Sequence, residues 1–162
     1  MTSDFIIRAL IVVLSLAGLV NALYFTFAYY GRIKKARWVP EILCAREGSS
    51  CVTVVQTPYA RVFGLPNSLL GIVYYSFLIV WASTGLVFGP IVGFVGRIAP
   101  LSIWAILGAS VVTLVLGFYL VYALRRKLHT HCPLCYLGHA INATLLVLII
   151  LTVRSMPTIW FW

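Results

Sequence analysis

Charged residues, and acidic ones above all, are scarce in this 162-residue sequence. Only 9% of the residues are charged, and 3 Asp and Glu stand against 12 Lys and Arg. Soluble domains carry roughly 25% charged residues, so the composition excludes an ordinary soluble domain. The 62% share of hydrophobic residues indicates an integral membrane protein. A net charge of +9 can mark a nucleic-acid partner, but these basic residues lie beside apolar runs. Membrane topology and anionic headgroups explain them better, and we expect no nucleic-acid partner.

The sequence also lacks an internal repeat, a low-complexity tract and a candidate soluble domain. No cleavable signal peptide is evident. The first apolar run continues uncharged from Ala9 to Tyr30, whereas the apolar part of a signal peptide has about 7 to 15 residues. We therefore expect this run to be a first membrane helix.

Four apolar runs approach the roughly 20 residues that a helix needs to cross a bilayer. They cover residues 5–30, 68–88, 101–124 and 135–153. The sequence thus predicts an all-α integral membrane protein, a single domain over residues 1–162 built as a four-transmembrane-helix bundle. The connection 31–67 is long, but its apolar residues argue against disorder, so we expect it to fold over the bundle as a lid.

The four cysteines form two pairs, Cys44 with Cys51 and Cys132 with Cys135. With four spans, the first and third connections lie on the same side of the membrane, so both pairs share one face. Cys132-Pro133-Leu134-Cys135 opens the fourth run, where the free N–H groups and the dipole of a helix N-terminus stabilise a thiolate. A dithiol on the loop could exchange with this second pair, which indicates a redox relay.

Other interpretations of the cysteines stay open. Cys44 and Cys51 taken alone are equally consistent with a structural disulfide. A zinc site could recruit His129 and His131, but the six residues between Cys44 and Cys51 are poor spacing for zinc, and we expect no metal. Covalent haem attachment needs His directly after the second Cys of the motif, and Tyr136 stands there.

Polar residues continue along the fourth run. Cys135, His139 and Asn142 are spaced i, i+4 and i+7, so they share one helix face. Such residues usually face the bundle interior and often mark function, although hydrogen bonds between helices also use them. Asn67, which begins the second run, could be an N-cap or could bind a carbonyl ligand. A quinone suits this setting, because it dissolves in lipid and takes the two electrons that one dithiol releases. The aromatic residues Tyr74, Tyr75 and Phe77 of the second run could line its pocket, or they could equally be core or lipid-facing residues.

These features resemble the vitamin K epoxide reductase family. The resemblance covers most of the chain: four spans, a pair of loop cysteines and a Cys-x-x-Cys motif that opens the last span. The stretch from Pro66 to Tyr75 looks like the start of the family's second span, and the stretch from Cys132 to Asn142 looks like its active-site helix.

The resemblance implies a role for each position. Cys44 would receive electrons from a reduced partner, Cys51 would exchange with Cys132, and Cys135 would be the thiol nearest the quinone. Asn67 would hydrogen-bond a quinone oxygen. Four further residues fall where the family lines its pocket: Val54, Val55, Leu70 and Tyr74.

One position departs from the family pattern. The family often has Tyr four residues after the last Cys, and here His139 stands there. His139 could still donate a hydrogen bond or a proton to the quinone. The resemblance therefore extends to this residue as a quinone-binding candidate, but not to a preference among quinones or to anticoagulant sensitivity.

The predicted function is that of a quinone-dependent thiol–disulfide oxidoreductase that supports disulfide-bond formation. The electron acceptor would be a quinone of the menaquinone, ubiquinone or vitamin K type. Many microbial members resemble this chain but carry a fused thioredoxin-like domain, so we expect a separate thioredoxin-like protein as the donor. Two alternatives stay open: a DsbB-type quinone reductase, which typically has its Cys-x-x-Cys in the first loop, and a non-enzymatic metal-binding or structural membrane protein.

Two features of the sequence favour opposite orientations in the membrane. Cytoplasmic loops are enriched in Lys and Arg, which favours a cytoplasmic cysteine side in a multi-pass protein of the cell membrane. Disulfide chemistry and the family resemblance favour the extracytoplasmic side. An inverted member serving cytosolic disulfides would reconcile both. Nine basic residues flank the cysteine side: Arg32, Lys34, Lys35, Arg37, Arg46, Arg61, Arg125, Arg126 and Lys127. Three lie on the other side: Arg8, Arg97 and Arg154.

Overall fold

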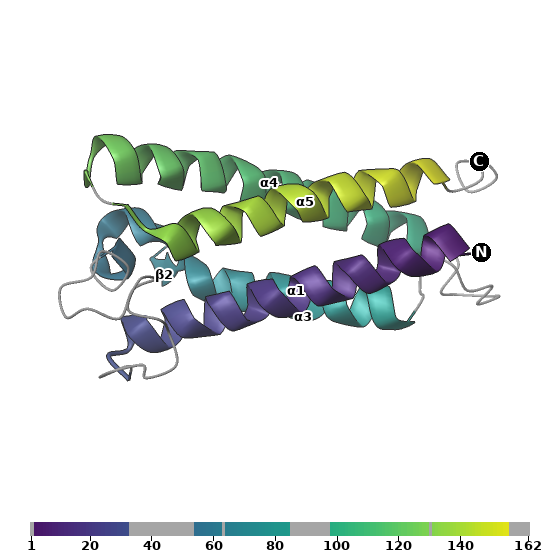
Figure 1. Cartoon of the computed structure of the whole chain (residues 1–162), viewed down its shortest axis with the longest axis horizontal. Coiled ribbons are helices and arrows are strands. Elements are labelled where there is room, and N and C mark those ends of the chain that lie inside the picture. Colours follow the sequence, from purple (N-terminus) through teal and green to yellow (C-terminus); the bar gives the residue numbers. More distant parts are fainter. Residues whose placement is uncertain (1, 33–53, 63, 85–97, 130, 156–162) are drawn as a thin grey trace.

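The structure is a computed structural model that describes residues 2–32, 54–62, 64–84, 98–129 and 131–155 (Figure 1). Cys44, Cys51 and most of the connection expected to form a lid lie outside the described residues. The described elements are α1 (Thr2–Tyr29), η1 (Pro58–Ala60), β1 (Arg61–Val62), β2 (Leu65–Pro66), α3 (Asn67–Thr84), α4 (Ile98–Arg126) and α5 (Pro133–Ser155).

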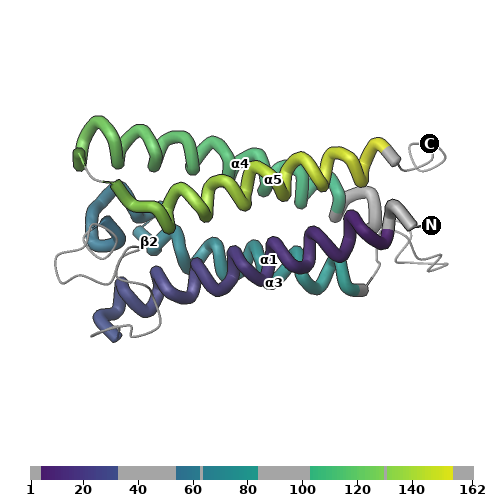
Figure 2. The backbone as a smooth tube through the Cα atoms, viewed as in Figure 1, coloured from purple at the N-terminus to yellow at the C-terminus, as the bar shows by residue number. Residues whose placement is uncertain are grey.

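The fold is almost wholly helical. Four long helices run side by side, and β1 and β2 form only a short antiparallel pair in which Arg61 faces Pro66 and Val62 faces Leu65. α1 packs most extensively against α3, and α5 packs against both α1 and α4 (Figure 2). The predicted all-α membrane architecture is therefore confirmed.

Among the residues that the structure describes, three helices are long and apolar enough to cross a membrane: Phe5–Tyr29, Ile103–Arg126 and Pro133–Arg154. The apolar part of α3, Asn67–Ser83, is shorter. At 1.5 Å per residue the 18 described residues of α3 reach roughly 27 Å, a little less than the roughly 30 Å of a hydrocarbon core. The protein is multi-pass, and the fourth crossing stays a prediction.

A glycine ends the first helix. Gly31 adopts a left-handed φ of 66°, which costs glycine little. The Arg32 N–H donates to the Phe27 carbonyl at 3.0 Å and the Gly31 N–H to the Ala28 carbonyl at 3.1 Å. These are the two bonds of a Schellman motif, and they satisfy carbonyls that the helix would otherwise leave open.

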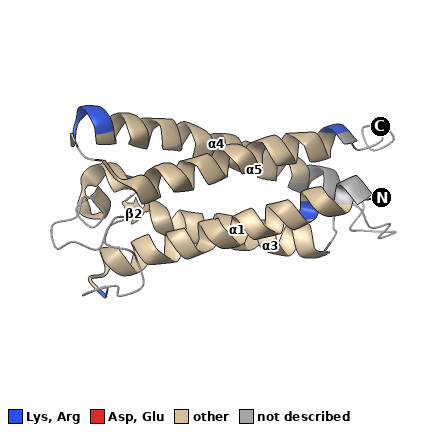
Figure 3. Cartoon of the chain, viewed as in Figure 1, with Lys and Arg blue, Asp and Glu red and all other residues tan. Residues whose placement is uncertain are grey.

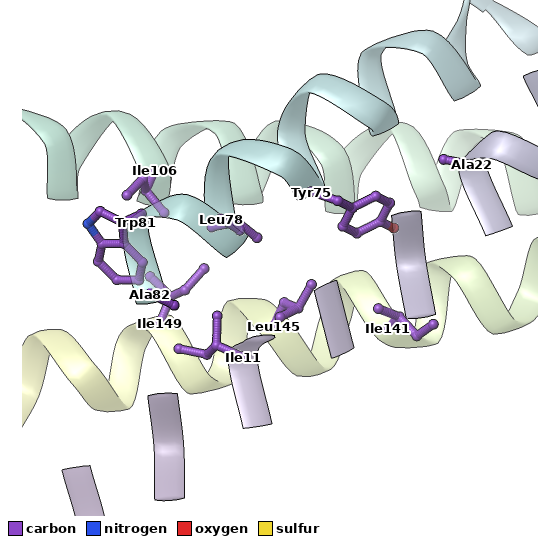
Figure 4. Packing of buried hydrophobic residues seen from close by; sticks show 10 residues of the cluster. All are labelled: Ile11, Ala22, Tyr75, Leu78, Trp81, Ala82, Ile106, Ile141, Leu145 and Ile149. Carbon is purple, nitrogen blue, oxygen red and sulfur yellow. The ribbon is translucent and has the colours of Figure 1, made fainter. Parts of the chain in front are cut away.

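Apolar side chains fill the space between the helices. Figure 4 shows this cluster extending from Ala22 at one end to Trp81 at the other. Outside the cluster, large apolar side chains such as Val73, Phe118 and Val147 are exposed. An apolar exterior suits lipid contact, and the hydrophobic cluster holds the helices in register. Its buried members are Ile11, Ala22, Tyr75, Leu78, Trp81, Ala82, Ile106, Ile141, Leu145 and Ile149.

The two ends of the bundle differ in charge. Figure 3 shows basic residues at the end where α4 stops, and this is also where α5 begins with its cysteines. Arg8 lies near the start of α1 and Arg154 in the last turn of α5, and these two helix ends lie at the opposite end of the bundle (Figure 1). There the Arg8 guanidinium donates two hydrogen bonds to the Ala82 carbonyl, at 3.1 Å from Nε and 2.8 Å from Nη2. This contact fastens the start of α1 to the end of α3.

Candidate functional site

The Cys-x-x-Cys motif forms the first turn of α5. Pro133 is the first helical residue, a position that proline favours because no N–H is needed there. Cys132 precedes it and caps the helix: its Sγ accepts the Cys135 N–H at 3.3 Å, and its carbonyl accepts the Tyr136 N–H at 3.2 Å. A disulfide joins Cys132 to Cys135. The sulfur of Cys132 thus lies among the N–H groups that stabilise a thiolate.

The two cysteines have different surroundings. Cys132 is fully buried, and it clusters with Val54 and Leu124. Cys135 is only partly buried and lines a cavity inside the bundle. Cys132 therefore lies in the packed end of the bundle, whereas Cys135 lies at the cavity.

The cavity has a volume of about 310 Å³, is lined by residues of all four helices and is partly open to the outside of the bundle. Ligand pockets in proteins commonly measure about 300 to 1,000 Å³, so this one suits a small or partly enclosed ligand. Most of its lining is apolar, and each of the four helices also contributes at least one polar side chain. The residues that line it are Gly18, Asn21, Ala22, Phe25, Val55, Asn67, Ser68, Leu70, Gly71, Tyr74, Tyr75, Ala109, Val112, Thr113, Leu116, Leu120, Cys135, Gly138, His139 and Asn142.

The predicted polar face of α5 lines this cavity. Cys135, His139 and Asn142 all contribute to it, one turn after another. The Asn142 Oδ1 accepts a hydrogen bond from the Tyr75 hydroxyl at 2.7 Å. Tyr75 lies against Gly18 of α1, where a Cβ would collide with its ring. Tyr75 of α3 therefore fixes Asn142 on this face of α5, and Gly18 of α1 leaves the space that the Tyr75 ring occupies.

Five of the six residues expected to bind a quinone line the cavity: Asn67, His139, Val55, Leu70 and Tyr74. Asn67 is the first residue of α3. The neighbouring Ser68 Oγ accepts a hydrogen bond from Thr26 Oγ1 of α1 at 3.0 Å. The Tyr74 hydroxyl is hydrogen-bonded to Ser110 of α4 at 2.9 Å. Val54 is the exception, because it packs beside Cys132 instead.

Asn21 is a site residue that the sequence analysis did not single out. Its Nδ2 donates to the Leu134 carbonyl, inside the Cys-x-x-Cys turn, at 3.4 Å. Its Oδ1 is buried without a hydrogen-bond partner in the part of the chain that the structure describes. A signal was available, since Asn21 is a lone carboxamide in the uncharged run from Ala9 to Tyr30 and such residues often mark function.

Metal binding has little support in this region. Within residues 2–32, 54–62, 64–84, 98–129 and 131–155, no group of three or more His, Cys, Asp or Glu side chains could hold a metal ion. His129 and His131, the candidate zinc ligands, are exposed, and Cys132 is buried in a disulfide. Cys44 and Cys51 lie outside the described residues, so this geometry does not bear on them.

The chain matches the sequence model of a known protein family. A search of curated proteins finds no relative. The sequence model of the vitamin K epoxide reductase family matches residues 9–150, a range that holds all four cysteines and every residue lining the cavity. This family consists of membrane thiol oxidoreductases that are linked to quinones. Since the match covers most of the chain, the protein belongs to the vitamin K epoxide reductase family.

Proposed function

We propose that this oxidoreductase carries electrons from a reduced thioredoxin-like protein to a membrane quinone and so supports disulfide formation. The observation that carries the proposal is the position of the Cys132–Cys135 pair. Cys132 is buried at the packed end of the bundle, and Cys135 lines the interior cavity. A pair placed in this way can take electrons from one side and release them to the other.

The relay has three steps, each of which moves two electrons. The partner's dithiol becomes a disulfide as Cys44–Cys51 is reduced. The Cys44/Cys51 dithiol then reduces the Cys132–Cys135 disulfide by thiol–disulfide exchange. Finally the Cys132/Cys135 dithiol re-forms its S–S bond, and its two electrons and two protons go to the quinone.

The contact of Val54 with Cys132 supports the middle step. Val54 follows Cys51 by three residues, and it packs in the same buried cluster as Cys132. Three residues of chain span at most about 11 Å. The loop that carries Cys51 can therefore bring it to Cys132 without rearrangement of the helices.

The cavity fits the head group of a quinone. Its lining is mostly apolar, and polar side chains enter from all four helices. We assign hydrogen bonding of the quinone oxygens to Asn67 and His139, and apolar contact to Val55, Leu70 and Tyr74. Bound there, a quinone would supply the two-electron acceptor for Cys135.

The donor would be a separate thioredoxin-like protein. We propose that it lies in the cytoplasm, because the charge count places nine basic residues on the cysteine side and three on the other. Arg125, Arg126 and Lys127 are exposed at that end. The chain would then be an inverted member of its family, embedded in the cell membrane.

The proposal is tested with the purified protein, a reduced thioredoxin-like donor and a short-chain quinone. We expect Cys135→Ala to abolish quinone reduction. Thr144→Ala is the control, since Thr144 is exposed on α5 and bonds only its own helix, at the Ala140 carbonyl. Full activity in Cys135→Ala would reject the mechanism. Stoichiometric zinc in the purified protein, together with inactive wild type, would favour the metal-binding alternative.

A further inference from the structure

His139 packs against a glycine of the neighbouring helix. A Cβ built on Gly117 of α4 would lie 2.8 Å from the His139 Nδ1 and 3.3 Å from its Cγ. Gly117 is itself buried. α4 can approach the imidazole this closely only because residue 117 carries no side chain. The ring is therefore backed by the main chain of α4 on the side of Nδ1.

This contact leaves Nδ1 with nothing to bond. The atom is closed to solvent and has no hydrogen-bond partner among the residues that the structure describes. A protonated imidazole carries N–H groups on both nitrogens, whereas a neutral one has a single donor and a single acceptor. A charged ring would bury an unsatisfied N–H against Gly117, which is unfavourable. The packing therefore favours the neutral tautomer with its hydrogen on Nε2.

We infer that Gly117 holds His139 as a neutral hydrogen-bond donor through Nε2, and that His139 does not relay protons. This inference rests on the proposed quinone reduction and assigns a role within it. A relay needs a proton source on one nitrogen and an acceptor on the other, and here Nδ1 faces a glycine. Gly117 is thus a positioning residue for the histidine that replaces the family's usual tyrosine.

The protons of the reaction then come from elsewhere. Oxidation of the Cys132/Cys135 dithiol breaks two S–H bonds and releases two protons, the number that reduction of a quinone consumes. The other titratable groups that line the cavity are Tyr74 and Tyr75 from α3 and Cys135 from α5, while α1 and α4 contribute none. Any pH dependence of quinone reduction is therefore expected to follow the thiols rather than His139.

Two substitutions of His139 separate the roles of donor and relay. His139→Gln keeps an N–H donor but cannot titrate, and His139→Leu removes the donor. We expect His139→Leu to raise the quinone KM roughly two- to tenfold, the value of one neutral hydrogen bond. His139→Gln should recover most of this loss and keep the wild-type pH profile. A proton relay would instead make both variants lose kcat by about 100-fold or more, and that result would overturn the inference.

The role of Gly117 is tested on the same helix. Gly117→Ala places a Cβ against Nδ1, whereas Gly108→Ala adds one where nothing lies within 4 Å. We expect Gly117→Ala to raise the quinone KM and Gly108→Ala to leave it unchanged. In a His139→Ala background, Gly117→Ala should have no further effect, because the residue acts through the ring. A penalty that persists without the imidazole would contradict the positioning role.

The proposed function and the inferred role of His139 can be rejected separately. If the wild-type protein does not reduce quinone with the thiol donor, the proposed function fails. If wild type is active but His139→Gln loses kcat and changes its pH profile, only the inference fails. Thermal unfolding of each variant shows whether an altered KM comes from a folded protein, and His139→Gln decides the question if Gly117→Ala does not fold.

Discussion

The hydroxyl of Tyr75 donates a 2.7 Å hydrogen bond to Oδ1 of Asn142, joining α3 to α5 at the cavity. The contact fixes the orientation of the Asn142 carboxamide. It uses the amide oxygen as acceptor and does not involve the amide N–H groups. Tyr75 is 5% exposed, so this bond lies in the bundle interior, where an unpaired acceptor is costly.

Tyr75→Phe should therefore lower the stability of the protein. It leaves the Asn142 oxygen buried without its donor, and we expect a loss of about 1 to 3 kcal/mol in the free energy of unfolding. Thermal or denaturant unfolding in detergent measures it. Tyr122→Phe is the control, since Tyr122 is exposed on α4. Equal stability of the two variants would contradict the structural role of the bond.

Asn21→Leu is expected to reduce activity more than stability. The leucine keeps the approximate volume but loses the bond to the Leu134 carbonyl, which fastens α1 to the cysteine turn. It also removes the buried, unpaired Oδ1, so the two effects on folding oppose each other, and we expect a change within about 1 kcal/mol.

The readout for Asn21 is the alkylation rate of Cys135 in the reduced protein, measured beside quinone reduction. The alkylation rate and the rate of quinone reduction should both change in Asn21→Leu. Neither should change in Val20→Leu, which alters an exposed neighbour on the same helix. If stability collapses and the remaining folded fraction has normal activity, Asn21 is a packing residue and not a positioning one.

Arg8→Ala should destabilise the bundle without changing its chemistry. The variant leaves the Ala82 carbonyl without two charged donors, and hydrogen bonds of that kind contribute about 1.5 to 3 kcal/mol. Because Arg8 lies near the start of α1, at the end of the bundle remote from the cysteines, activity per folded molecule should persist. Arg154→Ala removes the same charge toward the same end and is the matched control. Equal destabilisation by both would mean that the charge matters and the Ala82 contact does not.

Labelling of Cys44 tests the membrane orientation. In intact cells, an impermeant maleimide should fail to modify Cys44 until the membrane is opened, since we propose that the basic cysteine side faces the cytoplasm. A cysteine introduced at the opposite end, by Ser3→Cys, provides the control and should react in intact cells. The reverse pattern would reject the inverted orientation.

The apolar runs of the sequence indicate where helices lie better than where they end. The run 5–30 corresponds to α1, which ends at Tyr29, and the run 101–124 corresponds to α4, which continues to Arg126. Hydrophobicity follows the lipid-facing and buried stretches, whereas local hydrogen bonding sets helix ends. The left-handed Gly31 that ends α1 shows this.

The site was partly visible in the sequence for a similar reason. Cys135, His139 and Asn142 share one helix, so the 3.6-residue period was enough to place them on one face. Asn21 and Gly117 belong to other helices, and their contacts with α5 depend on how the helices pack. No pattern within one segment encodes that pairing, which is why the partner of His139 appears only in the structure.

The central claim is that the Cys132/Cys135 dithiol itself reduces the quinone. The most direct measurement uses the Cys44→Ala/Cys51→Ala variant, chemically reduced, freed of reductant and mixed with a short-chain quinone without air. We predict stoichiometric loss of oxidised quinone, measured by absorbance. The Cys132–Cys135 disulfide should form at the same time, as measured by mass spectrometry. A folded, fully reduced variant that leaves the quinone oxidised would contradict it.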